Sequence, residues 1–166
     1  MILIAIGSNL SSEKFGKPIN NCLEIIKIIS KVFIEKNKSF FYKSEPIPKS
    51  DQPWYVNGVI EIVANIGPQE ILKKLLSIEN SFGRKREKKN ESRVIDLDLL
   101  SFNNQVINTD LLILPHPRMH LRNFVLKPIL DINPNWVHPS MKKTARELIN
   151  EINDFQEIEK IPLVNS

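Results

Sequence analysis

Apolar residues along the chain first mark out strands. Residues 2–6 form an uninterrupted apolar run that ends at a glycine, which predicts a central strand buried on both faces. Residues 54–63 alternate between two faces, and residues 32–42 combine apolar ends with a polar middle; both patterns predict strands. A fourth apolar run, residues 93–100, begins with an arginine and is interrupted by two aspartates. The pattern therefore predicts four strands.

Between and after these strands, apolar residues recur every three or four positions, as on one face of a helix. This spacing holds over residues 19–29 and over residues 68–82, and a proline stands near the start of each segment, where its missing N–H is tolerated. Shorter helices are predicted near residues 124–132 and 144–152. The chain after residue 153 carries no usable pattern.

Two carboxylates stand out in the strand at residues 93–100. Side chains in a strand alternate, so Asp96 and Asp98 share one face while Leu97 and Leu99 point to a core on the other. Two like charges side by side repel each other and require a cation or solvent. The alternative to a metal site is a solvated sheet face on which lysines of a neighbouring strand balance the two aspartates.

The segment before this strand is strongly basic. Residues 83–93 contain six lysines and arginines. Paired carboxylates beside an arginine-rich loop suit Mg²⁺ together with a polyphosphate, because the metal prefers oxygen ligands and arginine binds phosphate bidentately. A plain solvated loop is the alternative interpretation.

A second candidate site lies on the strand at residues 54–63. Tyr55 and Asn57 are neighbours on one of its faces. An aromatic ring beside a carboxamide can stack on a flat heterocycle and hydrogen-bond to its edge. An ordinary packed tyrosine next to an asparagine at a strand start is the alternative.

Composition and charge constrain the type of protein and its compartment more than they constrain its chemistry. The chain has 166 residues, 42% of them hydrophobic and 25% charged, which is typical of one globular domain with a real core. Its net charge of +4 fits an anionic ligand only weakly. Cys22 is the one cysteine, so no intramolecular disulfide can form and a buried structural thiol is expected. With no signal-type or membrane-spanning apolar run, we expect a cytoplasmic protein.

Taken together, these landmarks resemble the 6-hydroxymethyl-7,8-dihydropterin pyrophosphokinase family of the folate pathway. Arg-x-x-Asp-Leu-Asp-Leu followed by Pro-His-Pro-Arg is a specific combination, and the likeness spans nearly the whole chain in order. The segments that carry it are Ala-Ile-Gly-Ser-Asn-Leu (5–10), Ser-Glu-Pro (44–46), Gln-Pro-Trp-Tyr-Val-Asn (52–57), Glu79 with Gly83-Arg84, residues 93–99, Pro-His-Pro-Arg-Met (115–119) and Arg-Asn-Phe (122–124).

The resemblance implies a fold and a reaction. The expected fold is α+β, an α-β-α sandwich of ferredoxin-like character with a mainly antiparallel sheet, in a single domain over residues 1–166. The expected enzyme transfers the β,γ-pyrophosphoryl group of ATP to the pterin hydroxymethyl oxygen and releases AMP. Its expected partners are the two small substrates and two Mg²⁺ ions, with no nucleic acid and no membrane, and we expect a monomer.

The resemblance also assigns roles to individual residues. Asp96 and Asp98 would hold the metal ions, which agrees with their shared strand face. Arg84 and Arg93 would neutralise charge on the transferred phosphates. Pterin contacts are assigned to the side chains of Tyr55, Asn57 and Phe124 and to the backbone near Ser44 and Ile47. ATP contacts are assigned to Arg86, His116, Arg122, the backbone around Leu99 and Ile113, and Glu79 near the nucleotide.

Two other classes of function remain open from the residues alone. Basic charge and strand aromatics permit an RNA-binding module on a ferredoxin-like sheet, although two aspartates on that sheet would repel phosphate. A metal-dependent nuclease or nucleotidyltransferase also combines carboxylates with arginines. The reaction product separates these classes, because AMP indicates pyrophosphoryl transfer and released pyrophosphate indicates nucleotidyl transfer.

Overall fold

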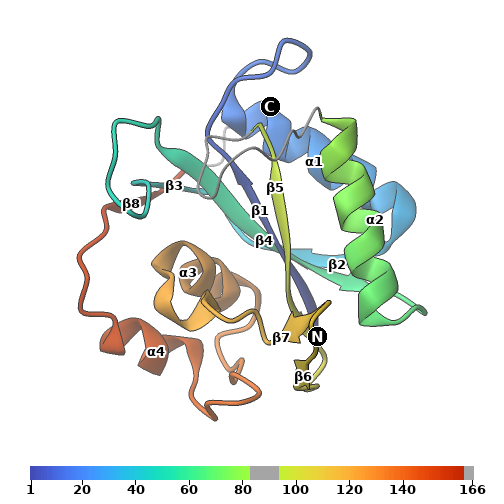
Figure 1. Cartoon of the computed structure of the whole chain (residues 1–166). Helices are drawn as coiled ribbons and strands as arrows, with labels where there is room; N and C mark the ends of the chain where they lie inside the picture. Colours follow the sequence, from blue (N-terminus) through green and yellow to red (C-terminus); the bar gives the residue numbers. More distant parts are fainter. Residues whose placement is uncertain (83–93, 163–166) are drawn as a thin grey trace.

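The computed structural model of the protein describes residues 1–82 and 94–162, in which helices cover both faces of a sheet (Figure 1). The elements in chain order are β1 (Ile2–Ser8), α1 (Pro18–Val32), β2 (Ile34–Lys38), β3 (Tyr42–Ser44), β4 (Tyr55–Val63), α2 (Pro68–Ser81), β5 (Asp96–Phe102), β6 (Ile107–Asn108), β7 (Ile113–Leu114), a 3₁₀ turn (Met119–Leu121), α3 (Asn123–Ile132), α4 (Ala145–Glu151) and β8 (Ile158–Lys160). None of the helices in these ranges is both long and apolar enough to span a membrane.

The sheet has the strand order β5-β1-β4-β3-β8, and β2 also pairs with β4. Each of these pairings is antiparallel. Strand β1 is therefore central, as its apolar run predicted, with β4 on one side and β5 on the other. The order β1-α1-β2-β4-α2-β5 is that of a ferredoxin-like fold. The predicted α+β class, with a mainly antiparallel sheet in an α-β-α sandwich, is confirmed.

Two apolar cores lie on opposite faces of the sheet. Helices α1 and α2 pack on one face, where Leu97 and Leu99 of β5 are buried among residues such as Ile25 and Leu75. Helices α3 and α4 pack on the other, around residues of the sheet that include Leu100. The alternation predicted for β5 therefore holds, and its aspartates lie on the α3 side. Cys22 is fully buried in the first core, and burial raises the pKa of its thiol, as expected for a structural cysteine.

The predicted strand over residues 32–42 is wrong as a single element. Helix α1 continues to Val32, and the rest divides into β2 and β3, which pair with different halves of β4. Between Lys38 and Tyr42 the chain advances four residues, while their partners on β4, Ile60 and Asn57, are three apart. The extra residue interrupts the ladder of backbone hydrogen bonds. At this point the Val59 N–H donates to the side-chain Oγ of Ser39, at 2.9 Å, instead of to a backbone carbonyl.

The final strand, β8, has no counterpart in the prediction. It pairs with β3 over Ser44↔Ile158, Lys43↔Glu159 and Tyr42↔Lys160. The segment that leads to it from α4, red in Figure 1, runs along the left side of the view to the edge of the sheet. A three-residue strand with one partially buried position shows too little alternation to be recognised in a sequence.

The break between β2 and β3 yields a prediction for stability. A Cβ added at Gly58 would lie 2.8 Å from two atoms of the Phe41 ring, whereas one added at Gly67 would meet nothing within 4 Å. We expect Gly58→Ala to lower the free energy of unfolding by about 1–3 kcal/mol, since the ring must move within a packed core. Gly67→Ala, the matched control, should change it by less than about 1 kcal/mol. Urea unfolding of both variants measures this, and equal values would contradict the steric explanation.

Candidate active site

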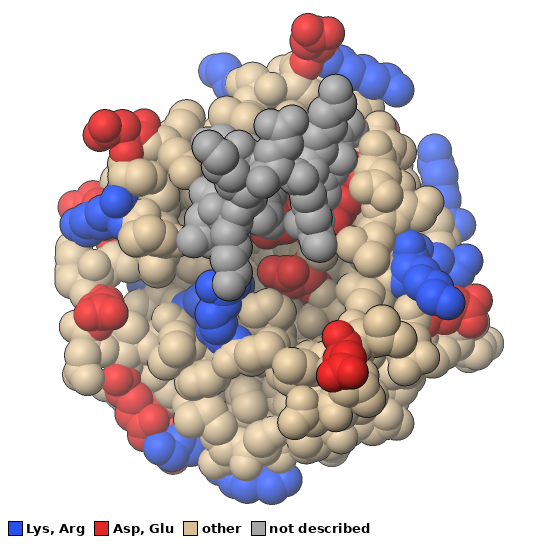
Figure 2. Space-filling view, in the orientation of Figure 1, with Lys and Arg blue, Asp and Glu red and all other residues tan. Residues whose placement is uncertain are grey.

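A cavity of about 1020 Å³ opens where β1, β4 and β5 meet the start of α3. The proline-rich segment after β3 and the segment after α4 complete its wall. Figure 2 shows acidic and basic side chains beside one another near the centre of the face of the molecule that it draws. Most of the site residues predicted from the sequence line this one cavity: Ser44, Ile47, Tyr55, Asn57, Asp96, Asp98, His116, Arg122 and Phe124.

The cavity floor depends on the register of three strands. Gly7 of β1 pairs with Asn57 of β4 on one side and with Asp96 of β5 on the other. Paired residues in a ladder share a face, so Asn57 and Asp96 flank a position that has no side chain. A Cβ added at Gly7 would lie 3.1 Å from Asn57 Oδ1 and 3.9 Å from Asp96 Cβ. The absence of a side chain at Gly7 therefore lets the amide oxygen of Asn57 lie close to the backbone of β1, at a point that Asp96 borders on the other side.

One side of the floor is suited to a flat polar ring. Asn57 and Ser44 are buried neighbours, and Asn57 Nδ2 donates to Ser44 Oγ at 2.7 Å, which fixes the orientation of the amide. Tyr55 at the start of β4 and Phe124 in the first turn of α3 also line the cavity. The structure thus brings two aromatic rings and a held carboxamide to the same space.

The proline-rich segment between β3 and β4 forms a second wall. Ile47 and Gln52 from this segment line the cavity. The loop after β1 holds its far end, because Asn9 Nδ2 donates to Pro53 O at 3.2 Å and to Gln52 Oε1 at 3.3 Å. The prolines of the segment restrict its backbone as well, so these hydrogen bonds and the prolines both favour one shape for this wall.

The opposite side of the floor is charged. Asp98, whose side chain is 36% exposed, has its Oδ2 3.9 Å from Arg122 Nη1 and 3.8 Å from His116 Nε2. Burial, reinforced by the positive charges of Arg122 and Arg118, lowers the pKa of His116 to about 4. The imidazole is therefore neutral at pH 7, so its approach to Asp98 is not an ion pair.

The tautomer of His116 follows from its backbone contacts. Its Nδ1 accepts the Arg118 N–H at 3.2 Å, so the neutral ring carries its proton on Nε2, which lies toward Asp98. The His116 N–H donates to Leu100 O at 2.8 Å, which attaches this segment to the end of β5. His116 is thus positioned as an uncharged hydrogen-bond donor beside the carboxylates.

The donor set can be compared with what a metal ion requires. Within residues 1–82 and 94–162, no group of three or more His, Cys, Asp or Glu side chains could hold a metal by itself. Asp96 and Asp98 nevertheless line the same cavity from one strand face. Mg²⁺ is commonly bound by one or two carboxylates, with waters and substrate phosphates completing the shell. The two aspartates fit an ion that arrives with a polyphosphate.

Several predicted ATP contacts do not line this cavity. Glu79 is buried under β5, where its Oε1 accepts the Leu97 N–H at 2.7 Å. The side chain of Leu99 lies in the core beside α2, and Ile113 lines a separate hollow of about 430 Å³ next to His116. The remaining predicted residues of the phosphate side, Arg84, Arg86 and Arg93, lie outside the described residues.

Part of the cavity wall comes from residues that no sequence pattern predicts. Asp154, Phe155 and Gln156 line it from the segment between α4 and β8, and Leu121 lines it from the 3₁₀ turn. Three of them follow residue 153, where no periodic pattern exists, and the pairing of β8 with β3 helps to bring them to the site.

The architecture argues against an open RNA-binding sheet. In the described part of the chain, α1 and α2 cover one face and α3 and α4 the other (Figure 1). Sheet-based RNA-binding modules stack bases on an exposed face of strands. Here the functional groups converge on a cavity at one end of the sheet instead.

Comparison with known proteins agrees with this geometry. The family model described as 7,8-dihydro-6-hydroxymethylpterin-pyrophosphokinase matches residues 3–134. The chain is 35% identical over 159 residues to the 2-amino-4-hydroxy-6-hydroxymethyldihydropteridine pyrophosphokinase of Haemophilus influenzae, which covers 96% of this chain and 97% of that protein. It is 36% identical over 129 residues to the Bacillus subtilis protein of the same name, covering 78% and 75% respectively.

A longer relative matches as well. The folic acid synthesis protein FOL1 of Dictyostelium discoideum is 34% identical over 162 residues, which is 98% of this chain but 24% of that protein. The chain thus spans about a quarter of the Dictyostelium protein and nearly all of the Haemophilus protein. The match of the family model over most of the chain, together with these identities, shows that the chain belongs to the 7,8-dihydro-6-hydroxymethylpterin-pyrophosphokinase family.

Proposed function

We propose that this protein transfers the β,γ-pyrophosphoryl group of ATP to the hydroxymethyl oxygen of 6-hydroxymethyl-7,8-dihydropterin. The new bond joins that oxygen to the β-phosphorus, the bond between the β-phosphorus and the bridging α–β oxygen breaks, and AMP leaves. The hydroxyl proton passes to solvent. The observation that carries the proposal is the convergence of a heterocycle-type surface and a carboxylate pair on one cavity, on either side of Gly7.

The pterin would lie on the uncharged side of the floor. Tyr55 and Phe124 offer faces for stacking, while the held amide of Asn57 offers a donor and an acceptor to the ring edge. The backbone near Ser44 and Ile47 would complete the hydrogen bonds. Such contacts hold the hydroxymethyl group in one orientation, which converts a bimolecular encounter into a positioned one.

The triphosphate would lie on the charged side. Asp96 and Asp98 would hold Mg²⁺, which when bound supplies charge neutralisation for the phosphates. Arg122 lies beside Asp98, and it would turn to phosphate oxygens when nucleotide binds. Neutral His116 contributes a hydrogen bond from Nε2 without adding charge. Roles for Arg84, Arg86, Arg93, Glu79, Leu99 and Ile113 toward ATP rest on the sequence.

The direct test is to identify the nucleotide product. The protein is incubated with ATP, Mg²⁺ and the reduced pterin alcohol, and the products are separated by chromatography. We expect AMP in equal amount to pterin diphosphate. Formation of ADP would indicate transfer of one phosphoryl group, and release of pyrophosphate would indicate nucleotidyl transfer; either result would contradict the proposal.

The metal assignment gives a prediction for Asp98. Asp98→Asn keeps the shape of the side chain but removes its charge, so kcat should fall about 100-fold or more, since coordinated metal supplies several kcal/mol of charge stabilisation. The midpoint of urea unfolding should stay close to that of the unmodified protein, because the side chain is 36% exposed. Asp110→Asn, an exposed position away from the cavity, is the control and should be fully active. Full activity of Asp98→Asn would remove the metal role.

The close approach of Asn57 to Gly7 gives a second prediction. Gly7→Ala would place a methyl group between Asn57 and Asp96, where the proposal seats the pterin. We expect KM for the pterin to rise by about 10-fold or more, since a methyl group in an occupied site costs about 1–3 kcal/mol. KM for ATP should change much less. Steady-state kinetics with each substrate varied in turn measures both constants, and a change confined to ATP would place the pterin elsewhere.

A further inference from the structure

The segment between α4 and β8 leaves a large aromatic side chain at the cavity. Phe155 is 79% exposed and lines the cavity wall. Two other apolar side chains of the wall, Ile47 and Leu121, are 53% and 58% exposed. Apolar side chains gathered in one concave place are typical of a ligand site, because each loses contact with water when the ligand arrives.

The segment is fixed to the chain that follows β3 directly after this aromatic residue. Gln156 is buried, and its Nε2 donates to Glu45 O at 2.7 Å. The Glu157 N–H donates to Glu45 Oε2 at 2.9 Å, and the Glu45 N–H donates to Glu157 O at 3.1 Å. The hydrogen bond from the Glu157 N–H, together with nearby Lys49, lowers the pKa of the Glu45 carboxyl. Phe155 is therefore tied through its neighbours to the segment that carries Ile47.

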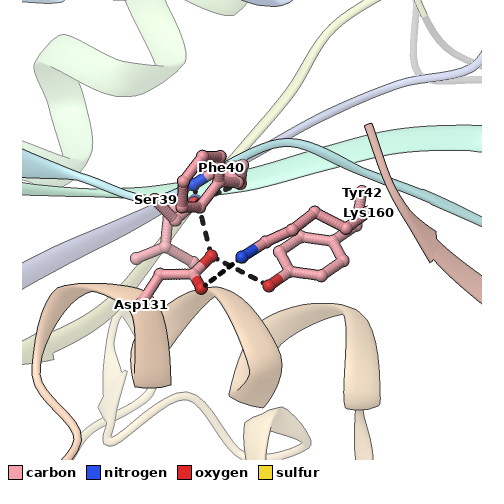
Figure 3. A network of polar contacts seen from close by, with 6 residues as sticks. Ser39, Phe40, Tyr42, Asp131 and Lys160 are labelled. Atoms are coloured by element: carbon pink, nitrogen blue, oxygen red, sulfur yellow. Dashed lines mark hydrogen bonds and ion pairs between the residues drawn. The ribbon is translucent and has the colours of Figure 1, made fainter. Parts of the chain in front are cut away.

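A second attachment holds β8 to α3 (Figure 3). Asp131 of α3 accepts three hydrogen bonds, from Phe40 N at 3.2 Å, from the Tyr42 hydroxyl at 2.9 Å and from Lys160 Nζ at 3.1 Å. Lys160 also lies 3.7 Å above the centre of the Phe40 ring. We call Asp131, Tyr42, Phe40 and Lys160 the C-terminal clasp.

The clasp is more than a surface ion pair. The side chain of Asp131 is 14% exposed, so its charge is partly shielded from water. Burial, together with the hydrogen bond to Asp131 and its negative charge, raises the pKa of the Tyr42 hydroxyl, which therefore stays protonated and donates at neutral pH. A shielded carboxylate with three donors is better held than an exposed pair. Both ends of the segment after Phe155 are thus fixed, at Glu45 and at Asp131.

We propose that Phe155 is a further substrate-contacting side chain, which covers the pterin from the segment between α4 and β8. The C-terminal clasp is then the positioning device that keeps Phe155 at the cavity. This inference rests on the proposed function, since it names an added contact for the same substrate. Phe155 is placed to add apolar contact to a ring held by Tyr55 and Phe124, and it lies beyond residue 134, where the match of the family model ends.

The first test removes the ring. Phe155→Ala should raise KM for the pterin about 3- to 10-fold, which is the range that one aromatic contact supplies. KM for ATP and the urea unfolding midpoint should not change, and Phe155→Tyr should restore KM for the pterin. The matched control is Ile34→Ala, which removes an exposed apolar side chain on β2, away from the cavity. An unchanged KM for the pterin in Phe155→Ala, or equal increases for both substrates, would overturn the proposal.

The second test asks whether the clasp acts through Phe155. Lys160→Met removes the contact to Asp131 but keeps most of the apolar stem, and it should raise KM for the pterin in the unmodified protein. In the Phe155→Ala background the same change should have no further effect, because there is no ring left to position. Additive effects would overturn the positioning role.

The two proposals fail in distinguishable ways. If the unmodified protein does not form AMP from ATP and the reduced pterin alcohol, the proposed function is wrong. If it forms AMP and the Phe155 variants bind the pterin as the unmodified protein does, only the inference about Phe155 and the clasp is wrong.

Discussion

The cross-strand register of Asp96, Gly7 and Asn57 is the constraint on which the site depends. Strand β1 is hydrogen-bonded on both sides, so its pairing fixes β4 and β5 relative to each other. A slip of one residue in either ladder would turn the aspartates or the asparagine to the opposite face, into an apolar core. The two cores resist such a slip, because Leu97 and Leu99 on one face and Leu100 on the other are buried.

This register also separates the cavity into two environments. On the β4 side, the Asn57 amide is held by Ser44 among aromatic side chains. On the β5 side, Asp98 faces Arg122 and a neutral histidine. The proposed function assigns the first environment to a flat heterocycle and the second to a metal with phosphates, with only the backbone of Gly7 between them. A group transfer from a nucleotide to a heterocyclic alcohol requires such an arrangement.

The sequence predicted most of this architecture because its patterns are local. The run at residues 2–6 and the alternation around Asp96 and Asp98 follow from the two-residue period of strands, and the helices follow from their own spacing. Residues 32–42 were predicted wrongly, because β2 and β3 pair with different halves of β4, and between these halves Gly58 leaves room for the Phe41 ring. No local pattern in those residues records that partner.

The same reasoning explains which parts of the candidate site were found. For the landmark residues in the strands and in the Pro-His-Pro-Arg segment, the residue types and their spacing predict a chemical role. Phe155 and the clasp residue Lys160 show no such pattern, since pairing with β3 and contact with α3 bring Phe155 to the cavity and Lys160 to Asp131. Contacts between residues far apart in the chain decide such positions, and a single sequence does not reveal them.

In the proposed reaction, two carboxylates and a carboxamide, placed by one strand register, serve two substrates in one cavity. A crystal structure with a non-hydrolysable ATP analogue, Mg²⁺ and the pterin tests it most directly. We expect Mg²⁺ bound by the carboxylates of Asp96 and Asp98, with the pterin ring over Gly7 against Asn57. Carboxylates in contact only with protein cations, or a pterin bound away from Gly7, would contradict it.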